Sequence, residues 1–282
     1  MGEPTRRFRH KLSIRLKRRQ IVEIIVCIKP VLDPDLPPMK FSIDAQKNCV
    51  IPPEGMPAVM NPYDALAVEA ALQIKEKQKG KVTVITLGSG EDVQRKALAM
   101  GADEAVIVKV EGLQEFDGPA KASLLSCAIK KIGSYDLVIC GRQAADWDLG
   151  VTGSMTAEYL GIPVLTRAKK IEITDGKLRI ERITANGNET YETVLPALVT
   201  VSSEMGKPRI PSGWGIINAT KKSIISWSQS DLGDNHRKVL GRNPLLKLYA
   251  SSNERKCELI AGKNTEEAAG RLADLIANMT GK

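Results

Sequence analysis

The chain has 282 residues, of which 43% are hydrophobic and only 4% aromatic, and its net charge is +8 at neutral pH. This length and composition favour one sizeable aliphatic core with a smaller appended piece. Its apolar runs all fall short of the roughly 20 residues that a membrane-spanning helix requires, so we expect no transmembrane segment and a cytoplasmic location of the bacterial type.

The positive charge is concentrated at the amino terminus. Residues 1–20 contain eight Lys or Arg and one acid, Glu3, and so carry +7 of the net charge of +8. We interpret these residues as a basic extension, expected to be disordered, whose role as a targeting segment, an anionic-surface contact or a plain extension stays open. Because the rest of the chain is nearly neutral, we expect no nucleic-acid partner.

The cysteines show no CxxC spacing, and most of them lie within apolar runs. They are Cys27, Cys49, Cys127, Cys140 and Cys257. This pattern predicts reduced thiols, with neither a disulfide framework nor a zinc site.

Strand and helix patterns alternate from residue 21 to residue 166. We expect strands at 21–28, 81–87, 105–110, 137–140 and from 164, and helices at 60–78, 92–100, 120–132 and 155–160. In the first helix Asn61 can act as the cap and Pro62 fits the first turn. Alternation of this kind predicts a doubly wound, mostly parallel α/β sheet with helices on both faces.

The pattern changes after residue 169. Alternating segments around the turns Asp175-Gly176 and 186–188 predict antiparallel edge hairpins, and the apolar run 197–201 is expected to re-enter the main sheet. Residues 211–215 read as irregular, and 221–228 as a short exposed strand at most. Residues 228–253 read as an extended arm, followed by a terminal helix from the cap Thr265 to residue 279. We therefore divide the chain into 1–20, a nucleotide-binding domain at 21–228, and an arm with a helix at 229–282.

The segment 136–163 carries the strongest functional signal. A buried strand runs into the polar loop Gly141–Gly153 and then into a helix. Ligands of open α/β sheets bind beyond the carboxyl ends of the strands, and a helix N-terminus favours phosphate. The loop is therefore a candidate nucleotide site, although a plain capped turn fits the spacing equally well, because no GxGxxG or GKS motif is present.

Two further loops should meet the same edge of the sheet. Asn61 and Pro62 follow the first strand and the turn Gly88-Ser89-Gly90 follows the second, and each alone is ordinary cap or turn chemistry. Their expected convergence with the loop 141–153 strengthens the site hypothesis.

Catalytic groups are scarce in the sequence. His236 is the only histidine after the basic arm, and Asp146 and Asp148 are more typical of ribose acceptors or loop supports than of an acid–base pair. We therefore expect a nucleotide-binding protein without catalytic residues or metal of its own.

Three runs resemble the β subunit of electron transfer flavoproteins, including the FixA-like bacterial members. They are GRQAADWDLGVTG, MNPYDALAVEAAL and ALAMGADEAVIV, and the similarity extends over about residues 21–230. The resemblance implies an adenine-nucleotide α-hydrolase-like fold and a heterodimer whose α subunit binds most of a shared FAD. It also implies AMP, or a second FAD in electron-bifurcating members, in the crevice of this chain.

The resemblance also implies the site and the partners. Electrons would pass through flavin between acyl-CoA dehydrogenases and a quinone-linked or NAD-linked acceptor, which includes a membrane quinone oxidoreductase. Carried over to matching positions, the nucleotide contacts would be the Cys27 backbone, Asn61, Pro62, Gly88, Ser89, Gly141, Arg142, Gln143, Ala144, Asp146, Asp148, Gly150, Val151 and Thr152.

This chain departs from the family pattern at several positions. Val151 stands where the family often has Gln, and Pro34 stands where some members place an aromatic residue against the shared flavin. Gly213 takes the place of a Leu that anchors the dehydrogenase, and Trp214 follows it. We expect a shifted docking site at Gly213 and Trp214, the alternative being that Trp214 packs against its own sheet.

Two other functions remain open. A nucleotide-binding sensor or stress-protein-like module would use the same fold and crevice without a partner. A stand-alone hydrolase would use Asp146 and Asp148.

Overall fold

A computed structural model describes residues 21–37, 40–113, 117–233, 245–249 and 257–280. The chain divides into two compact units, Met1–Lys247 and Leu248–Lys282. The basic extension 1–20 and His236 lie outside the described residues. The division into three parts at residues 20 and 228 stays a prediction.

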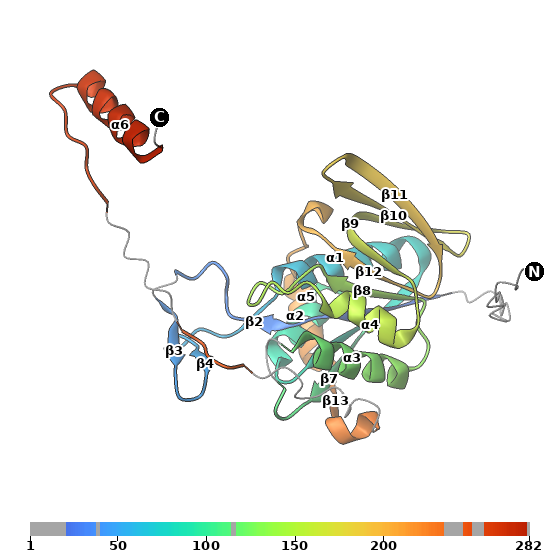
Figure 1. Cartoon of the computed structure of the whole chain (residues 1–282). Helices are drawn as coiled ribbons and strands as arrows, with labels where there is room; N and C mark the ends of the chain where they lie inside the picture. The colour runs from blue at the N-terminus through green and yellow to red at the C-terminus, as the bar shows by residue number, and fades with distance from the viewer. Residues whose placement is uncertain (1–20, 38–39, 114–116, 234–244, 250–256, 281–282) are drawn as a thin grey trace, which may run out of the picture. The chain divides into compact units, whose positions relative to one another are not determined.

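A nine-stranded sheet forms the centre of the first unit (Figure 1). Its strands lie in the order β11-β10-β9-β12-β8-β1-β6-β7-β13, and all of them from β9 to β13 in this order run parallel. The bounds are β1 (Val22–Cys27), β6 (Gly80–Leu87), β7 (Glu104–Lys109), β8 (Leu137–Gly141), β9 (Val164–Thr174), β10 (Lys177–Thr184), β11 (Gly187–Val194), β12 (Ala197–Val201) and β13 (Ile225–Ser228). This topology confirms the predicted fold class.

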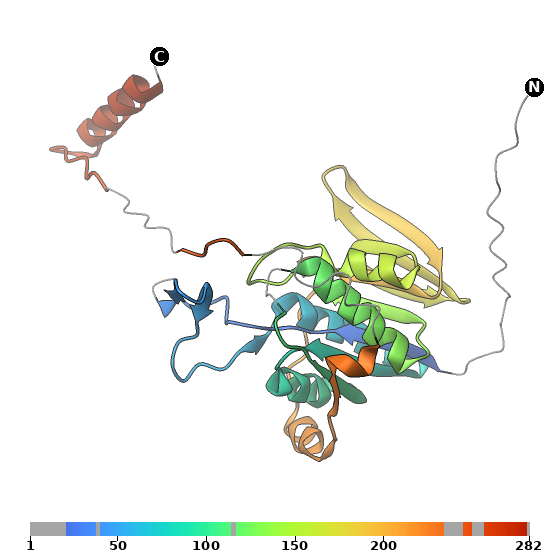
Figure 2. The same cartoon turned by 60° about the horizontal axis from the view of Figure 1, so that its bottom comes forward.

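Helices cover both faces of this sheet, as Figures 1 and 2 show. One face packs against α1 (Pro62–Gln78), α2 (Glu91–Met100) and α5 (Gly213–Lys221), and the other against α3 (Gly118–Ile132) and α4 (Thr152–Leu160). Successive strand side chains point to opposite faces, so Val26 contributes to the first core and Ile25 to the second. Such two-sided burial explains the unbroken apolar runs of β1 and β8.

Two small ladders accompany the main sheet. Strand β2 (Pro30–Val31) pairs antiparallel with β5 (Val59–Met60), and β3 (Ser42–Asp44) forms a hairpin with β4 (Cys49–Ile51).

The antiparallel hairpins at the sheet edge are also confirmed. Strand β10 pairs with both β9 and β11, and the β9–β10 turn places Asp175 and Gly176 at φ values of 53° and 75°. Positive φ at both central residues fits the twist of a two-residue hairpin, and Asp-Gly is a favoured sequence for it. Strand β12 returns to the main sheet between β8 and β9, as predicted.

The segment 211–228 is more ordered than the sequence indicates. Residues 211–215 do not stay irregular, because α5 begins at Gly213 and the Ser212 hydroxyl caps it by accepting the N–H of Gly215 at 3.0 Å. The short strand expected near residue 228 is β13, a parallel edge strand beside β7. Its Trp227 packs against the core that α3 covers, so the strand is not merely exposed.

The second unit contains one described helix, α6 (Thr265–Thr280). Thr265 is its first residue and not its cap, because Asn264 accepts the backbone N–H of Glu267 at 2.9 Å. Leu272, Ile276 and Met279 are 46%, 52% and 86% exposed, so this helix presents apolar side chains to its surroundings. Across the described segments of both units, none of the helices has the length and apolar character needed to cross a bilayer.

Candidate functional site

A cavity opens where the order of the sheet reverses direction. From β1 the chain continues to β6 and β7 on one side, whereas β8 lies on the other side, with Cys27 of β1 directly beside Cys140 of β8. The cavity at the carboxyl ends of these strands has a volume of about 330 Å³. Both its place at the switch point and its size are typical of ligand sites in open α/β sheets.

Three loops meet at this cavity, as the sequence predicted. Among the predicted contacts its walls include Cys27, Asn61, Gly88, Ser89, Gly141, Arg142, Gln143, Ala144, Asp146, Gly150 and Thr152. Pro62, Asp148 and Val151 are not part of the wall, and Gly213 and Trp214 lie on α5. That any of these residues binds a nucleotide stays a prediction.

Asn61 has a different role from the predicted helix cap. Its side chain makes no cap hydrogen bond. Instead the amide donates to the Gln143 carbonyl at 2.8 Å and accepts the Ala145 N–H at 3.2 Å, and the residue is only 1% exposed. A buried amide with both groups satisfied fixes its partners, so Asn61 shapes the loop 141–151 from across the cavity.

Asp64 joins the ends of the two central strands. Its carboxylate accepts the backbone N–H of Lys29 at 2.8 Å and that of Gly141 at 3.2 Å. Burial raises the pKa of Asp64 to about 7 despite these hydrogen bonds. Gly141 lacks the side chain that would block this contact, because a Cβ there would lie 2.7 Å from the Cβ of Tyr63 and would overlap Asp64 Oδ1.

Polar contacts hold the loop 141–151 in place at the mouth of the cavity. Lys29 forms an ion pair with Asp146, and Gln143 donates to the Asp148 carboxylate at 2.7 Å. The Arg142 guanidinium lies 5.1 Å from the centre of the Tyr63 ring and donates to its hydroxyl at 3.2 Å. Both acids therefore have structural contacts, which favours their role as loop supports.

The Cys27 and Cys140 side chains lie together on the floor of the cavity. Both residues line it and are only 8% and 6% exposed. A hydrogen bond with Cys27, together with burial, raises the pKa of the Cys140 thiol. The Cys140 thiol therefore stays protonated at neutral pH and acts as a small apolar group.

The cavity combines anion-binding groups with an apolar wall. The first residues of α3 and α4, Gly118 and Thr152, line it, and free backbone N–H groups at such helix starts favour phosphate. Lys121 adds positive charge, whereas Leu87, Val110 and Leu125 supply apolar surface. This donor set fits an adenine nucleotide, whose base is apolar on its faces and whose phosphate is anionic.

Sequence reasoning missed several residues of this site. Asp64, Lys29, Lys121 and Trp147 all line the cavity but were not singled out. Lys29 directly follows the first strand, so its position was a usable signal. Asp64 looks like an ordinary acid in the first turn of α1, and only the fold shows that both its oxygens meet strand ends.

The fold is that of an open, mostly parallel α/β protein with a cavity at the switch point of its sheet, and comparison with known proteins identifies its family. Residues 49–232 match the electron transfer flavoprotein domain family. The chain is 39% identical over 259 residues to an electron transfer flavoprotein subunit beta of Thermoanaerobacterium thermosaccharolyticum, a match covering 90% of this chain and 97% of that relative. The chain therefore belongs to the electron transfer flavoprotein family and resembles its β subunits.

Other relatives support this assignment. The caffeyl-CoA reductase-Etf complex subunit CarD of Acetobacterium woodii is 36% identical over 257 residues, covering 89% of this chain and 96% of that relative. An electron transfer flavoprotein subunit beta of Mycobacterium leprae is 40% identical over 187 residues, covering 64% of this chain and 70% of that relative. An electron transfer role therefore follows at the level of the family.

Apart from the cavity, α5 and the residues directly before it carry exposed apolar side chains. Trp214 is 73% exposed, so the alternative that it packs against its own sheet is wrong. Ile210, Ile216 and Ile217 are 91%, 54% and 52% exposed. A large aromatic residue among exposed isoleucines is typical of a protein–protein contact.

Proposed function

We propose that this chain is the β subunit of a heterodimeric electron transfer flavoprotein. It pairs with an α subunit, holds AMP or a second FAD in the cavity beyond β1 and β8, and helps to form the site of an FAD that the two subunits share. The observation that carries this proposal is the cavity at the switch point, whose helix starts and apolar wall fit an adenine nucleotide. Similarity to β subunits over 90% of the chain supports the pairing.

The redox chemistry belongs to the flavin, which accepts and releases electrons when it is bound. The residues of this chain supply binding and position, and none of them is proposed as a catalytic group. Electrons would pass between an acyl-CoA dehydrogenase and a quinone-linked or NAD-linked acceptor. The name of the Acetobacterium woodii relative, which links it to a CoA-thioester reductase, supports a CoA-thioester partner.

Two surfaces are proposed for the partners. Gly213 and Trp214 on α5 would contact the dehydrogenase, because Trp214 is 73% exposed beside other exposed apolar residues. The C-terminal arm and α6 would pack on the α subunit, which would cover the exposed Leu272, Ile276 and Met279.

Co-expression with the α subunit tests the whole proposal. We expect a yellow heterodimer, and mass spectrometry of the extracted nucleotides should find FAD alone or FAD with AMP. The FAD-to-heterodimer ratio, one or two, distinguishes AMP from a second FAD in the cavity. A colourless monomer that hydrolyses ATP would instead support the hydrolase alternative, and a monomer that only binds nucleotide would support the sensor alternative.

A further inference from the structure

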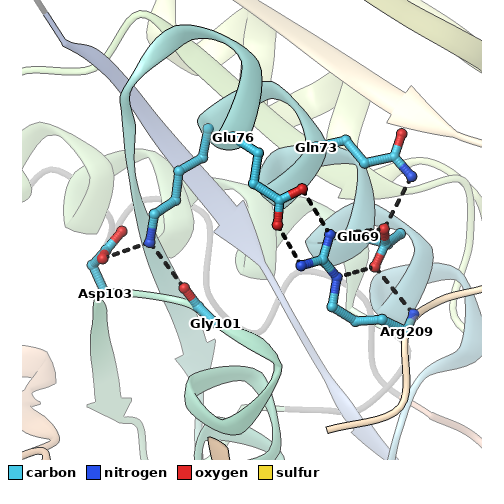
Figure 3. A network of polar contacts seen from close by, with 7 residues as sticks. Glu69, Gln73, Glu76, Gly101, Asp103 and Arg209 are labelled. Atoms are coloured by element: carbon cyan, nitrogen blue, oxygen red, sulfur yellow. Dashed lines mark hydrogen bonds and ion pairs between the residues drawn. The ribbon is translucent and has the colours of Figure 1, made fainter. Parts of the chain in front are cut away.

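Arg209 fastens the segment before α5 to helix α1 (Figure 3). Its Nε lies 2.7 Å from Glu69 Oε2, and its backbone N–H donates to the same oxygen at 3.1 Å. Its two terminal nitrogens reach Glu76 at 2.5 and 3.3 Å, and one of them also reaches Glu69 Oε1 at 3.1 Å. One side chain therefore bridges two carboxylates that lie two helical turns apart on α1.

The charges of this cluster reinforce one another. Burial alone would raise the pKa of Glu69, but hydrogen bonds from Arg209 and Gln73 lower it below its usual value. Arg209 likewise lowers the pKa of Glu76, while both carboxylates raise the pKa of the guanidinium. Glu69 is only 7% exposed, so its negative charge depends on Arg209 for compensation.

Helix α2, on which α5 packs, is held in place by other contacts. Lys75 of α1 contacts Asp103 at 2.6 Å and the Gly101 carbonyl at 3.0 Å, which ties the end of α2 to α1. Arg95 of α2 donates to the Ala219 carbonyl at 2.8 Å and the Lys222 carbonyl at 2.5 Å, at the end of α5. Arg209 is thus the ionic anchor at the start of this segment, and Arg95 is the anchor at its end.

The exposed apolar residues lie between these two anchors. Ile210 directly follows Arg209, and Trp214 stands in the first turn of α5. Gly215 packs so closely on α2 that a Cβ there would overlap the Ala99 carbonyl oxygen. Because Ile210 is 91% exposed, it does little to hold the chain before α5, so the position of the start of the segment 210–217 relative to α1 depends on Arg209.

We infer that Arg209 is a positioning residue for partner docking: by bridging Glu69 and Glu76 it holds the segment 210–217 in the conformation that meets the electron-donating partner. This inference rests on the docking surface proposed above. A docking segment that is ordered before encounter avoids the entropic cost of ordering during association. Loss of Arg209 should therefore weaken docking without changing the electron-transfer step inside the docked complex.

The test uses the flavin-loaded heterodimer as the varied substrate of a purified acyl-CoA dehydrogenase from the same organism. We expect Arg209→Ala to raise KM for the heterodimer about tenfold, as loss of charge-assisted hydrogen bonds of ordinary strength would, with kcat almost unchanged. Glu76→Gln removes one carboxylate charge at an exposed position and should raise KM less. Arg209→Lys keeps the positive charge but lacks the several N–H donors with which the guanidinium reaches both carboxylates. Its KM should therefore lie between those of the wild type and Arg209→Ala.

Lys207→Ala is the matched control, because it removes a nearby exposed positive charge for which the described contacts include no ion pair. It should leave KM unchanged. Hydrogen exchange followed by mass spectrometry should show faster exchange in residues 208–217 of Arg209→Ala and Glu76→Gln, but not of Lys207→Ala.

The outcomes separate this inference from the proposed function. If Trp214→Ala raises KM while Arg209→Ala and Glu76→Gln do not, the docking surface stands and the positioning role is wrong. If Trp214→Ala also leaves KM unchanged, the proposed docking surface itself is wrong. If Arg209→Ala loses flavin or lowers kcat while Glu76→Gln has no effect on KM, Arg209 only supports the fold and the inference is overturned.

Discussion

The carboxylate of Asp64 accepts the backbone N–H of Lys29 at 2.8 Å, two residues beyond the end of β1. Its second oxygen accepts the N–H of Gly141 at the end of β8. One buried side chain at the start of α1 therefore sets the separation of the two strand ends between which the cavity opens.

The protonation of Asp64 should make folding stability depend on pH. Burial raises its pKa from 3.8 to about 7, so between these values the folded state keeps a proton that the unfolded state has lost. The stabilisation is fully present below pH 4 and is lost as pH rises through 7, by an amount on the order of 4 kcal/mol. Chemical unfolding from pH 4 to pH 8 should show this fall for the wild type, and Asp64→Asn should lack it. Equal pH dependence in both proteins would contradict the prediction.

Gly141→Ala should disrupt the same contact by sterics. The added Cβ would lie 2.7 Å from the Cβ of Tyr63 and 2.9 Å from its carbonyl carbon, both of which belong to the start of α1. Overpacking of this kind costs about 1–3 kcal/mol, so we expect a lower melting temperature and weaker nucleotide binding. Gly270→Ala in α6 is the control, since nothing lies within 4 Å of a Cβ there. A Gly141→Ala protein as stable as the control would show that the strand ends can move apart freely.

Asn61→Ala should loosen the loop 141–151. The substitution leaves the Gln143 carbonyl and the Ala145 N–H without their side-chain partner. Each unsatisfied buried group costs about 1–3 kcal/mol, so AMP binding to the heterodimer, measured by calorimetry after removal of the resident nucleotide, should weaken at least tenfold. Asn61→Asp keeps the acceptor for the Ala145 N–H but loses the donor to Gln143. Its AMP affinity should therefore lie between those of the wild type and Asn61→Ala. An unchanged AMP affinity in Asn61→Ala would show that the position of the loop 141–151 does not affect ligand binding.

The cysteines should divide by reactivity. Cys49 and Cys257 are exposed, whereas Cys27 and Cys140 are buried and a hydrogen bond with Cys27 raises the pKa of Cys140. A thiol reagent applied to the folded chain should label Cys49 and Cys257 quickly, and Cys27 and Cys140 only after unfolding. Peptide mapping after timed alkylation provides the measurement. Rapid labelling of Cys140 in the folded chain would mean that the cavity floor opens readily.

The sequence predicts the parallel sheet well because strands that are buried on both faces have a recognisable local sequence pattern. Strands such as β1 and β8 are unbroken apolar runs, and the Asp175-Gly176 turn has the chemistry of its hairpin. The position of the site follows as well, since loops after parallel strands must meet at one edge. These features depend on residues that are close in sequence and on the general rules for connecting parallel strands. Both can be recognised from the sequence alone.

What the sequence did not predict depends on contacts between distant residues. Pro211, Gly213 and Gly215 argue against a helix, yet α5 forms because Ser212 caps it and Arg95 holds its last carbonyls. Asn61 has the sequence of a helix cap, but its amide is used 82 residues away at Gln143. In both cases contacts with residues distant in sequence override the conformation that the local sequence favours. No local pattern predicts these contacts.

Strand β11 ends the sheet on the side of the hairpins, and an outer strand is where another polypeptide could add itself. Here that outer strand carries Glu189 and Glu192, whose charges are matched by Arg182 and Lys177 of β10 within the same hairpin. An approaching chain would have to disturb these internal ion pairs and dehydrate their carboxylates. The ion-paired hairpins therefore disfavour the addition of a second copy of the chain at this edge of the sheet. Association is then more favourable at the exposed apolar surfaces described above.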